Sequence, residues 1–167
     1  MSLDGKIARA DGDVSWLENL PHPEGEDYGY AKFYGEIDTT IQGAATYREV
    51  LGFGVEFPYK DKTNYVITSD PIKTKDENVT FISSDLDVFM KDLLSKQGKD
   101  IWLIGGGKMN SLFLNNGWLD EMIIHVMPIV IGEGLPLFAD GVKDQQMKLK
   151  GQKVYESGVI ELNYKIK

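Results

Sequence analysis

Apolar residues recur along the chain with two different periods, which predict alternating helices and strands. Helical spacing is found in residues 27–37, 44–52, 84–97 and 108–117. Short β-branched or continuously apolar runs occupy residues 38–43, 63–69, 79–83 and 100–105. Because these strand patterns alternate with helical ones, the sequence predicts an α/β fold with a mainly parallel central sheet and helices on both faces.

The pattern changes near the C-terminus. Residues 119–132 are expected to form a long strand, interrupted by Pro128, which cannot donate to a strand ladder and indicates an edge or a bulge there. In residues 160–166 apolar and polar side chains alternate, which is typical of a half-buried antiparallel strand. Together with residues 146–155 and a turn at 156–158, this run predicts a C-terminal antiparallel hairpin.

Two features at strand and helix boundaries need separate comment. Ser84 and Asp87 form an S-x-x-D signal, so a helix is expected to begin at Ser84 and to end before Gly98. Residues 9–27 show no regular period and are expected to form a long loop, a kind of segment that often carries function.

Composition narrows the classes of function. The 167 residues suit one domain, and a net charge of −8 argues against a nucleic-acid partner, since phosphate contacts need clustered basic residues. The chain has no cysteine and no apolar run near the length of a membrane span. We therefore expect a cytoplasmic protein that binds a small molecule and neither nucleic acid nor membrane.

Three consecutive glycines, Gly105, Gly106 and Gly107, stand between an apolar strand and a helix. Ligands bind outside the carboxyl ends of parallel strands, where glycines let the backbone approach closely and a helix N-terminus favours an anion. The triplet is neither a G-x-G-x-x-G fingerprint nor a P-loop. A diphosphate seat and a tight turn without a ligand both remain open.

Wider motifs resemble the dihydrofolate reductase superfamily. "DGKIA", "IQGAATY", "VITS" and "LIGGG…LDEMIIHVMPIVIGEGLPLF" occur in the order seen in that fold. The last block is most similar to the reductase domain of the bifunctional riboflavin-biosynthesis enzymes, the RibD C-terminal domain family. The resemblance covers nearly the whole chain and implies a three-layer dihydrofolate reductase-like domain.

In this superfamily NADPH lies across the carboxyl edge of the sheet, with no bound metal, and the resemblance assigns its contacts to four places. The implied cofactor-binding residues are Gly105, Gly106, Gly107, Lys108 and Met109 at the pyrophosphate, Gly43, Ala44 and Thr46 at a second phosphate turn, Thr68 and Ser69 at the adenosine ribose, and Ile7 and Ala8 at the nicotinamide carboxamide.

The resemblance also implies three substrate-binding residues, Trp16, Asp27 and Tyr47. Asp27 is the candidate catalytic acid, because true dihydrofolate reductases carry one buried acid at the start of the first helix, and Glu133 is either a site acid or a turn residue. The alternative is that Glu26 and Asp27 are helix N-terminal acids that the macrodipole favours. His125 is expected to be a satisfied or interface histidine, and no metal site is predicted.

Two departures from the family pattern affect these expectations. The second turn usually contains an arginine that binds the 2′-phosphate, and Ala44 stands there instead. Losing a charge-assisted contact of about 1.5–3 kcal/mol weakens NADPH relative to NADH by roughly one to two orders of magnitude. Lys73 or Lys75 are candidates to compensate, so NADPH and NADH both stay open.

The second departure is that the family places a central strand just before the "SLDGKIA" motif. This sequence begins with that motif, so we expect a single domain over residues 1–167 in which the strand is missing.

The combined reading is an NAD(P)H-dependent reductase that transfers a hydride to a pterin-like or pyrimidine-like substrate. Two alternatives stay open: the reductase of riboflavin biosynthesis that acts on a ribosylaminopyrimidine, and a nucleotide-binding dimer without turnover. The lack of a deaminase domain and of a basic cluster for a substrate phosphate argues against the first. Related reductases dimerise, so a homodimer through the apolar residues 122–131 is expected.

Overall fold

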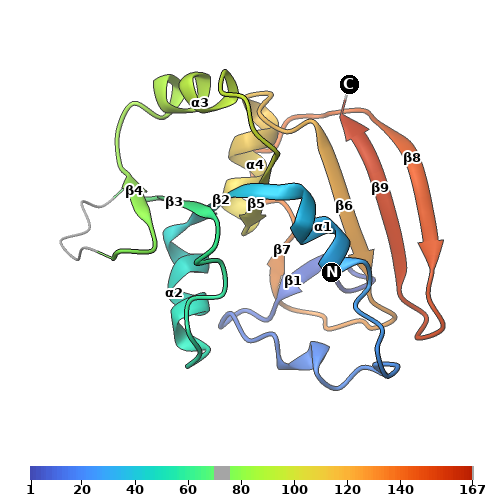
Figure 1. Cartoon of the computed structure of the whole chain (residues 1–167). Helices are drawn as coiled ribbons and strands as arrows, with labels where there is room; N and C mark the ends of the chain where they lie inside the picture. The colour runs from blue at the N-terminus through green and yellow to red at the C-terminus, as the bar shows by residue number, and fades with distance from the viewer. Residues whose placement is uncertain (70–75, 167) are drawn as a thin grey trace. The chain divides into compact units, whose positions relative to one another are not determined.

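The computed structural model describes residues 1–69 and 76–166 (Figure 1). Lys73 and Lys75, the candidate replacements for the missing arginine, lie outside the described residues. The chain divides into two compact units, Gly29–Met109 and the combination of Met1–Tyr28 with Asn110–Lys167. The expectation of a single domain stays a prediction.

The unit of residues 29–109 is built on a four-stranded sheet with the order β4-β3-β2-β5. Its strands are β2 (Ile37–Gly43), β3 (Thr63–Ile67), β4 (Thr80–Ile82) and β5 (Asp100–Gly105). Every neighbouring pair is parallel, so the prediction of a parallel sheet is confirmed. All four strands therefore end at the same edge.

Helices cover both faces of this sheet, as predicted. The helices described in this unit are α1 (Tyr30–Glu36), α2 (Ala44–Gly52) and α3 (Leu86–Leu94), and α4 (Gly107–Asn115) begins at its end. Val50 of α2 packs in a buried cluster with Val66 of β3, whereas Phe89 of α3 contacts Tyr65, with ring centroids 4.9 Å apart. Since adjacent strand residues point to opposite faces, α2 and α3 lie on opposite sides of the sheet.

The start of α3 differs from the prediction. The N-cap residue is Asp85, not Ser84, and its φ of 52° places it in the left-handed region. Aspartate tolerates this conformation better than most residues, because its short polar side chain costs little there. The S-x-x-D signal therefore identified the helix correctly and misplaced its first turn.

One buried polar side chain on β2 stands apart from its neighbours. Thr40 and Gln42 lie on the same face of the strand, and both are fully buried. The Thr40 hydroxyl donates to Asn64 Oδ1 over 2.7 Å, while neither amide atom of Gln42 has a hydrogen-bond partner within the described residues. Buried polar groups without partners are uncommon in native proteins.

The other unit contains two antiparallel sheets, with orders β1-β7 and β6-β9-β8. Its strands are β1 (Lys6–Ala8), β6 (Glu121–Val126), β7 (Leu135–Pro136), β8 (Met147–Val154) and β9 (Ile160–Ile166). The β8–β9 hairpin confirms the predicted C-terminal pair. β6 ends at Val126, two residues before Pro128, so the predicted long strand 119–132 is shorter than expected.

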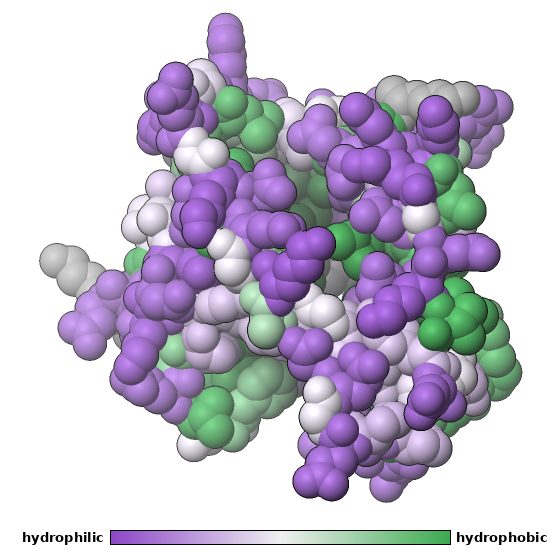
Figure 2. Space-filling view, turned by 45° about the vertical axis from the view of Figure 1, so that its right-hand side comes forward, coloured by the Kyte–Doolittle hydropathy of each residue, from purple (hydrophilic) through white to green (hydrophobic). Residues whose placement is uncertain are grey.

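The loop over residues 9–27 is confirmed, apart from one short 3₁₀ turn, η1 (Ser15–Leu17). The small β1–β7 sheet was not predicted, because strands of two and three residues are too short to show a period. Hydrophilic side chains dominate the visible surface, with separate hydrophobic areas between them (Figure 2).

Candidate functional site

The two turns that the sequence singled out lie side by side at the carboxyl edge of the parallel sheet. β2 ends at Gly43 and α2 follows at once, while β5 ends at Gly105 and α4 begins at Gly107. Gln42 pairs with Gly105 across the two strands. A Cβ atom added to Gly43 would lie 2.9 Å from Met109 Cγ and 3.9 Å from the Gly105 carbonyl oxygen. The structure thus brings Gly43, Gly105 and Met109 together.

Both helices at this edge present N-terminal backbone N–H groups. The N-cap of α2 is Gly43, which has no side chain to cap the helix, and Ala44 and Thr46 form its first turn. Neither α2 nor α4 carries an acidic residue in its first turn, and Lys108 is exposed at the start of α4. Two such N-termini favour an anion, so these residues fit the diphosphate of a dinucleotide.

Gly105 has a backbone conformation that requires glycine. Its φ is +111°, which residues with a Cβ atom rarely adopt, and its main chain is buried at the end of β5. Gly106 and Gly107 follow without side chains of their own, and the Met109 side chain packs beside Gly43 where the two turns meet.

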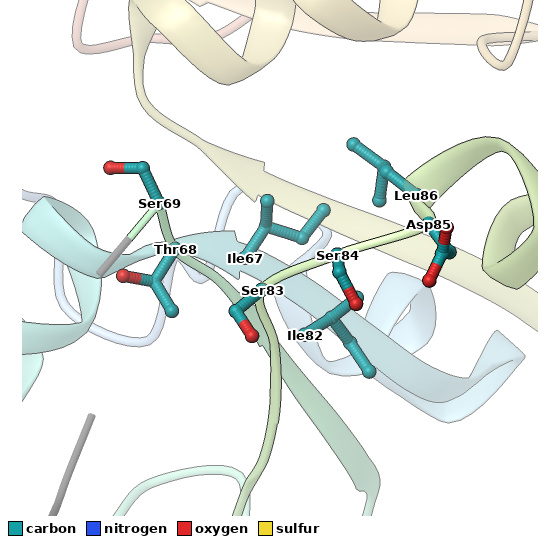
Figure 3. Close-up of a pocket in the computed structure, with 8 residues that line it drawn as sticks. All are labelled: Ile67, Thr68, Ser69, Ile82, Ser83, Ser84, Asp85 and Leu86. Carbon is teal, nitrogen blue, oxygen red and sulfur yellow. The ribbon is translucent and has the colours of Figure 1, made fainter. Parts of the chain in front are cut away.

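A pocket lies next to the first turn, at the ends of β3 and β4 (Figure 3). Its volume is about 350 Å³. The residues that line it are Ile67, Thr68, Ser69, Ile82, Ser83, Ser84, Asp85 and Leu86. Ile67 pairs directly with Gly43, so the pocket adjoins the first turn and contains Thr68 and Ser69, the residues assigned to the adenosine ribose.

Tyr47 is a residue of α2 whose side chain is buried in the core. Its hydroxyl donates a hydrogen bond of 2.5 Å to Asp76 Oδ2, and its ring contacts Phe57 and Phe81. Burial, together with the Asp76 carboxylate, raises the pKa of Tyr47 to about 12. A substrate contact for Tyr47 stays a prediction, and its observed contacts are those of a core residue.

We expect Tyr47→Phe to lower the free energy of unfolding by about 0.5–1.5 kcal/mol at neutral pH, because a partly exposed carboxylate loses one hydrogen bond. The Tyr47 hydroxyl is the main cause that lowers the pKa of Asp76. A carboxyl pKa that is lower in the folded protein stabilises the fold at pH values above the ordinary carboxyl pKa. This contribution is lost as the pH falls through the lowered pKa.

The destabilisation should therefore shrink in acid, and urea unfolding of both proteins over an acidic pH series measures it. The raised pKa of the Tyr47 phenol gives the opposite pH dependence. Its contribution to the stability of wild type is present at neutral pH and should be lost as the pH rises toward about 12. A difference between the two proteins that stays constant with pH would contradict the assignment.

In the other unit, β1 carries Ile7 and Ala8, the residues assigned to the nicotinamide carboxamide. The Asp4 carboxylate accepts hydrogen bonds from the N–H groups of Ile131 and Gly132, at 3.2 and 2.8 Å. These bonds, after one from its neighbour Ser2, lower the pKa of Asp4. The loop after β6 is thereby fastened to the turn that precedes Ile7.

Trp16, the predicted loop tryptophan, is only 2% exposed in η1. Its indole Nε1 is buried and has no hydrogen-bond partner within the described residues. A buried N–H without an acceptor is uncommon in native proteins. A substrate contact for Trp16 stays a prediction.

Asp27 precedes α1 and does not form part of it. The helix begins at Tyr30 after Gly29, and its first turn contains no acid, so the interpretation of Glu26 and Asp27 as helix N-terminal acids is wrong. Glu26 accepts a hydrogen bond from the Tyr28 N–H over 2.9 Å, and Asp27 is exposed. The catalytic role of Asp27 stays a prediction.

Sequence reasoning missed a polar cluster in the same unit. Glu161 Oε2 accepts a hydrogen bond of 2.8 Å from the Tyr155 hydroxyl and lies 3.3 Å from His125 Nε2. Burial first, then Glu161 and the charges of Glu26 and Asp27, raise the pKa of Tyr155. Asp27 therefore has titratable neighbours. No sequence motif marks Tyr155 and Glu161, which belong to the β8–β9 hairpin.

His125 is a satisfied histidine, as expected, because its Nε2 lies near both Glu161 and the Tyr28 carbonyl oxygen. Within residues 1–69 and 76–166, no group of histidine and acidic side chains is placed to hold a metal ion. No helix in this part of the chain is long and apolar enough to cross a bilayer.

Comparisons with known proteins identify the family of the chain. A sequence profile of the RibD C-terminal domain matches residues 56–160. The uncharacterized protein YwjB of Bacillus subtilis (strain 168) is 41% identical over 165 residues, covering 98% of this chain and 92% of YwjB.

Two solved structures are similar along the whole chain. A candidate riboflavin biosynthesis protein from Shewanella sp. PV-4 has a TM-score of 0.88 and 28% identity, covering 100% of this chain and 95% of that one. Dihydrofolate reductase from Enterococcus faecalis, solved with NADP(H), has a TM-score of 0.68 and 17% identity, covering 99% and 92%. The second similarity establishes the fold alone.

Proposed function

Because the chain belongs to the RibD C-terminal domain family, whose members are NAD(P)H-dependent reductases with the dihydrofolate reductase fold, we propose that it transfers a hydride from NAD(P)H to a pterin-like or pyrimidine-like substrate. The observation that supports this most strongly is the pair of turns at Gly43 and Gly105–Gly107. Each turn ends a parallel strand, contains glycine and opens a helix, and the Met109 side chain packs beside Gly43.

Each part of the site has a separate task in this proposal. The backbone N–H groups at the starts of α2 and α4 hold the diphosphate, and the pocket beyond β3 and β4 holds the adenosine. In the other unit, Asp4 fixes the turn that precedes Ile7 and Ala8, the two residues that the family resemblance assigns to the nicotinamide. The bound cofactor supplies the hydride, and the protein positions it.

Reduction of a C=N bond also requires a proton. Asp27 is the proposed relay, because it is exposed beside the polar cluster of Tyr155, Glu161 and His125. A carboxylic acid or a water molecule that it orients can supply this proton when the group lies within hydrogen-bond reach of the acceptor.

A second candidate substrate is the ribosylaminopyrimidine of riboflavin biosynthesis, which the similarity to the Shewanella protein favours. The experiment is an oxidation assay that follows the dihydronicotinamide absorbance with dihydropterins, dihydrofolate and the ribosylaminopyrimidine in parallel. Turnover with one class identifies the substrate. Saturable cofactor binding without turnover on any of them would instead support a nucleotide-binding module.

We propose that two copies associate through one face of the β6-β9-β8 sheet. Leu149 pairs with Tyr164 and Val154 pairs with Ile160, so these apolar side chains share a face. Leu149 is 46% exposed, Val154 69% and Ile160 38%. An apolar face of this kind favours a second copy, since monomers rarely expose contiguous apolar patches.

Sedimentation velocity should therefore show a dimer for the wild type and a shift toward monomer for Val154→Glu, which places a charge on the apolar face. Val88→Glu on α3 is the matched control, because Val88 is also 69% exposed and lies outside this sheet. A monomeric wild type, or equal effects of the two substitutions, would rule out this interface.

A further inference from the structure

We infer that the pocket at the ends of β3 and β4 selects NADH over NADPH, because Asp85 accepts hydrogen bonds from the free ribose hydroxyls and repels a 2′-phosphate. This inference rests on the proposed function, since it takes the pocket as the adenosine site of the cofactor. It goes beyond that function by assigning the cofactor preference to one side chain.

The pocket has two kinds of lining that suit an adenosine. Ile67, Ile82 and Leu86 give it an apolar part against which an adenine ring can pack. Its polar part comes from the end of β3 and from the connection between β4 and α3, seen on the two sides of the view (Figure 3). The polar residues are Thr68, Ser69, Ser83, Ser84 and Asp85.

Among the described residues that line the pocket, Asp85 is the only charged one. As the N-cap of α3 it makes no side-chain cap bond, and its carboxylate has no hydrogen-bond or ion-pair partner in the part of the chain described. Its acceptor oxygens are thus available.

A carboxylate at this place distinguishes the two cofactors. The ribose of NADH offers two hydroxyl donors, and an acidic residue that accepts from them is the common way to bind such a ribose. The ribose of NADPH has a 2′-phosphate, which is an anion and has no donor at that position. Like charges repel, so the same carboxylate opposes NADPH.

No basic side chain in the described part of the site offsets this repulsion. The lining residues include neither lysine nor arginine, and the turn after Gly43 continues with Ala44 and Ala45. Bidentate arginine contacts are the usual means of holding a phosphate. Both features therefore act in the same direction, toward a dinucleotide without a 2′-phosphate.

The test is isothermal titration calorimetry of the full chain with NADH and NADPH, in parallel and at low ionic strength. We expect NADH to bind at least about tenfold more tightly, and we expect added salt to reduce this ratio because it screens the repulsion. The readout is binding alone, so it does not depend on the identity of the substrate.

Asp85→Asn is the decisive variant. Asparagine tolerates the left-handed φ of 52° as aspartate does, so the start of α3 should be preserved. We expect the NADH/NADPH affinity ratio to fall to about one, with NADH weaker and NADPH tighter. Asp87→Asn is the matched control, because Asp87 is an exposed acid in the first turn of α3 that does not line the pocket, and the ratio should not change.

The outcomes distinguish a failure of the assignment to Asp85 from a failure of the proposed function. A wild type that prefers NADPH, or an Asp85→Asn ratio equal to that of wild type, would overturn the assignment to Asp85 and leave the proposed function standing. If neither dinucleotide binds, the proposed function fails and this inference fails with it.

Discussion

Replacing Gln42 with methionine is expected to raise the free energy of unfolding by about 1–3 kcal/mol, the cost of a buried polar group that lacks a partner. Gln42 is fully buried, and both of its amide atoms lack hydrogen bonds within the described residues. Methionine has nearly the same volume and shape, so the substitution removes the unsatisfied amide without creating a cavity.

Thr40→Val is the matched comparison on the same face of β2. It removes the hydrogen bond that the Thr40 hydroxyl donates to Asn64 Oδ1 in the buried sheet. The free energy of unfolding should therefore fall by about 1–3 kcal/mol, a change opposite in sign to that of Gln42→Met. Urea unfolding measures both changes. If Gln42→Met is destabilising instead, the amide has a partner such as an ordered buried water, and the interpretation of Gln42 as unsatisfied is wrong.

Gly134→Ala is expected to destabilise the protein by about 1–3 kcal/mol, because the added carbon meets rigid backbone. A Cβ atom at this position would lie only 2.3 Å from the Ala8 carbonyl oxygen, across the β1–β7 pair. The main chain of Ala8 would have to move. If Ile7 and Ala8 position the nicotinamide, affinity for NADH and NADPH should fall as well.

Gly151→Ala is the control for this change. Gly151 lies in β8, where a Cβ atom would meet nothing within 4 Å, so alanine should be neutral or slightly stabilising. Thermal unfolding and a cofactor titration of both variants complete the test. An unchanged melting temperature for Gly134→Ala would contradict the close approach of the loop to Ala8.

The parallel sheet and its helices were predictable because their signals are local. Each strand of that sheet is a continuous apolar or β-branched run, and each helix shows its period within a few turns. The end of β5 at Gly105 could be placed for the same reason, since an apolar run stops there at three glycines.

The errors concern features that depend on non-local contacts or on single backbone angles. The β1–β7 pair joins segments far apart in the chain, and a few residues carry no readable period. The start of α3 depends on the left-handed φ of Asp85, which a capping motif does not encode. Likewise, α1 begins at Tyr30 after the N-cap residue Gly29, so Asp27 lies outside the helix in which the sequence pattern placed it.

The candidate site was predicted in part for the same reasons. Gly43 and Gly105–Gly107 end adjacent strands, and parallel order alone places those turns at one edge. The bond between Tyr47 and Asp76, by contrast, joins residues 29 positions apart, and no pattern connects them. The cluster of Tyr155, Glu161 and His125 also required the hairpin register before it could be found.

The central claim is that this sheet edge binds a nicotinamide dinucleotide, and the most direct measurement is a titration with NADH and NADPH followed by tryptophan fluorescence. Trp102 on β5 and Trp16 on η1 are the reporters. The account predicts saturation by at least one cofactor below about 1 mM, the upper end of ordinary enzyme affinities. No saturation by either cofactor at that concentration would mean that the glycines only form a turn, and the reductase proposal would have to be abandoned.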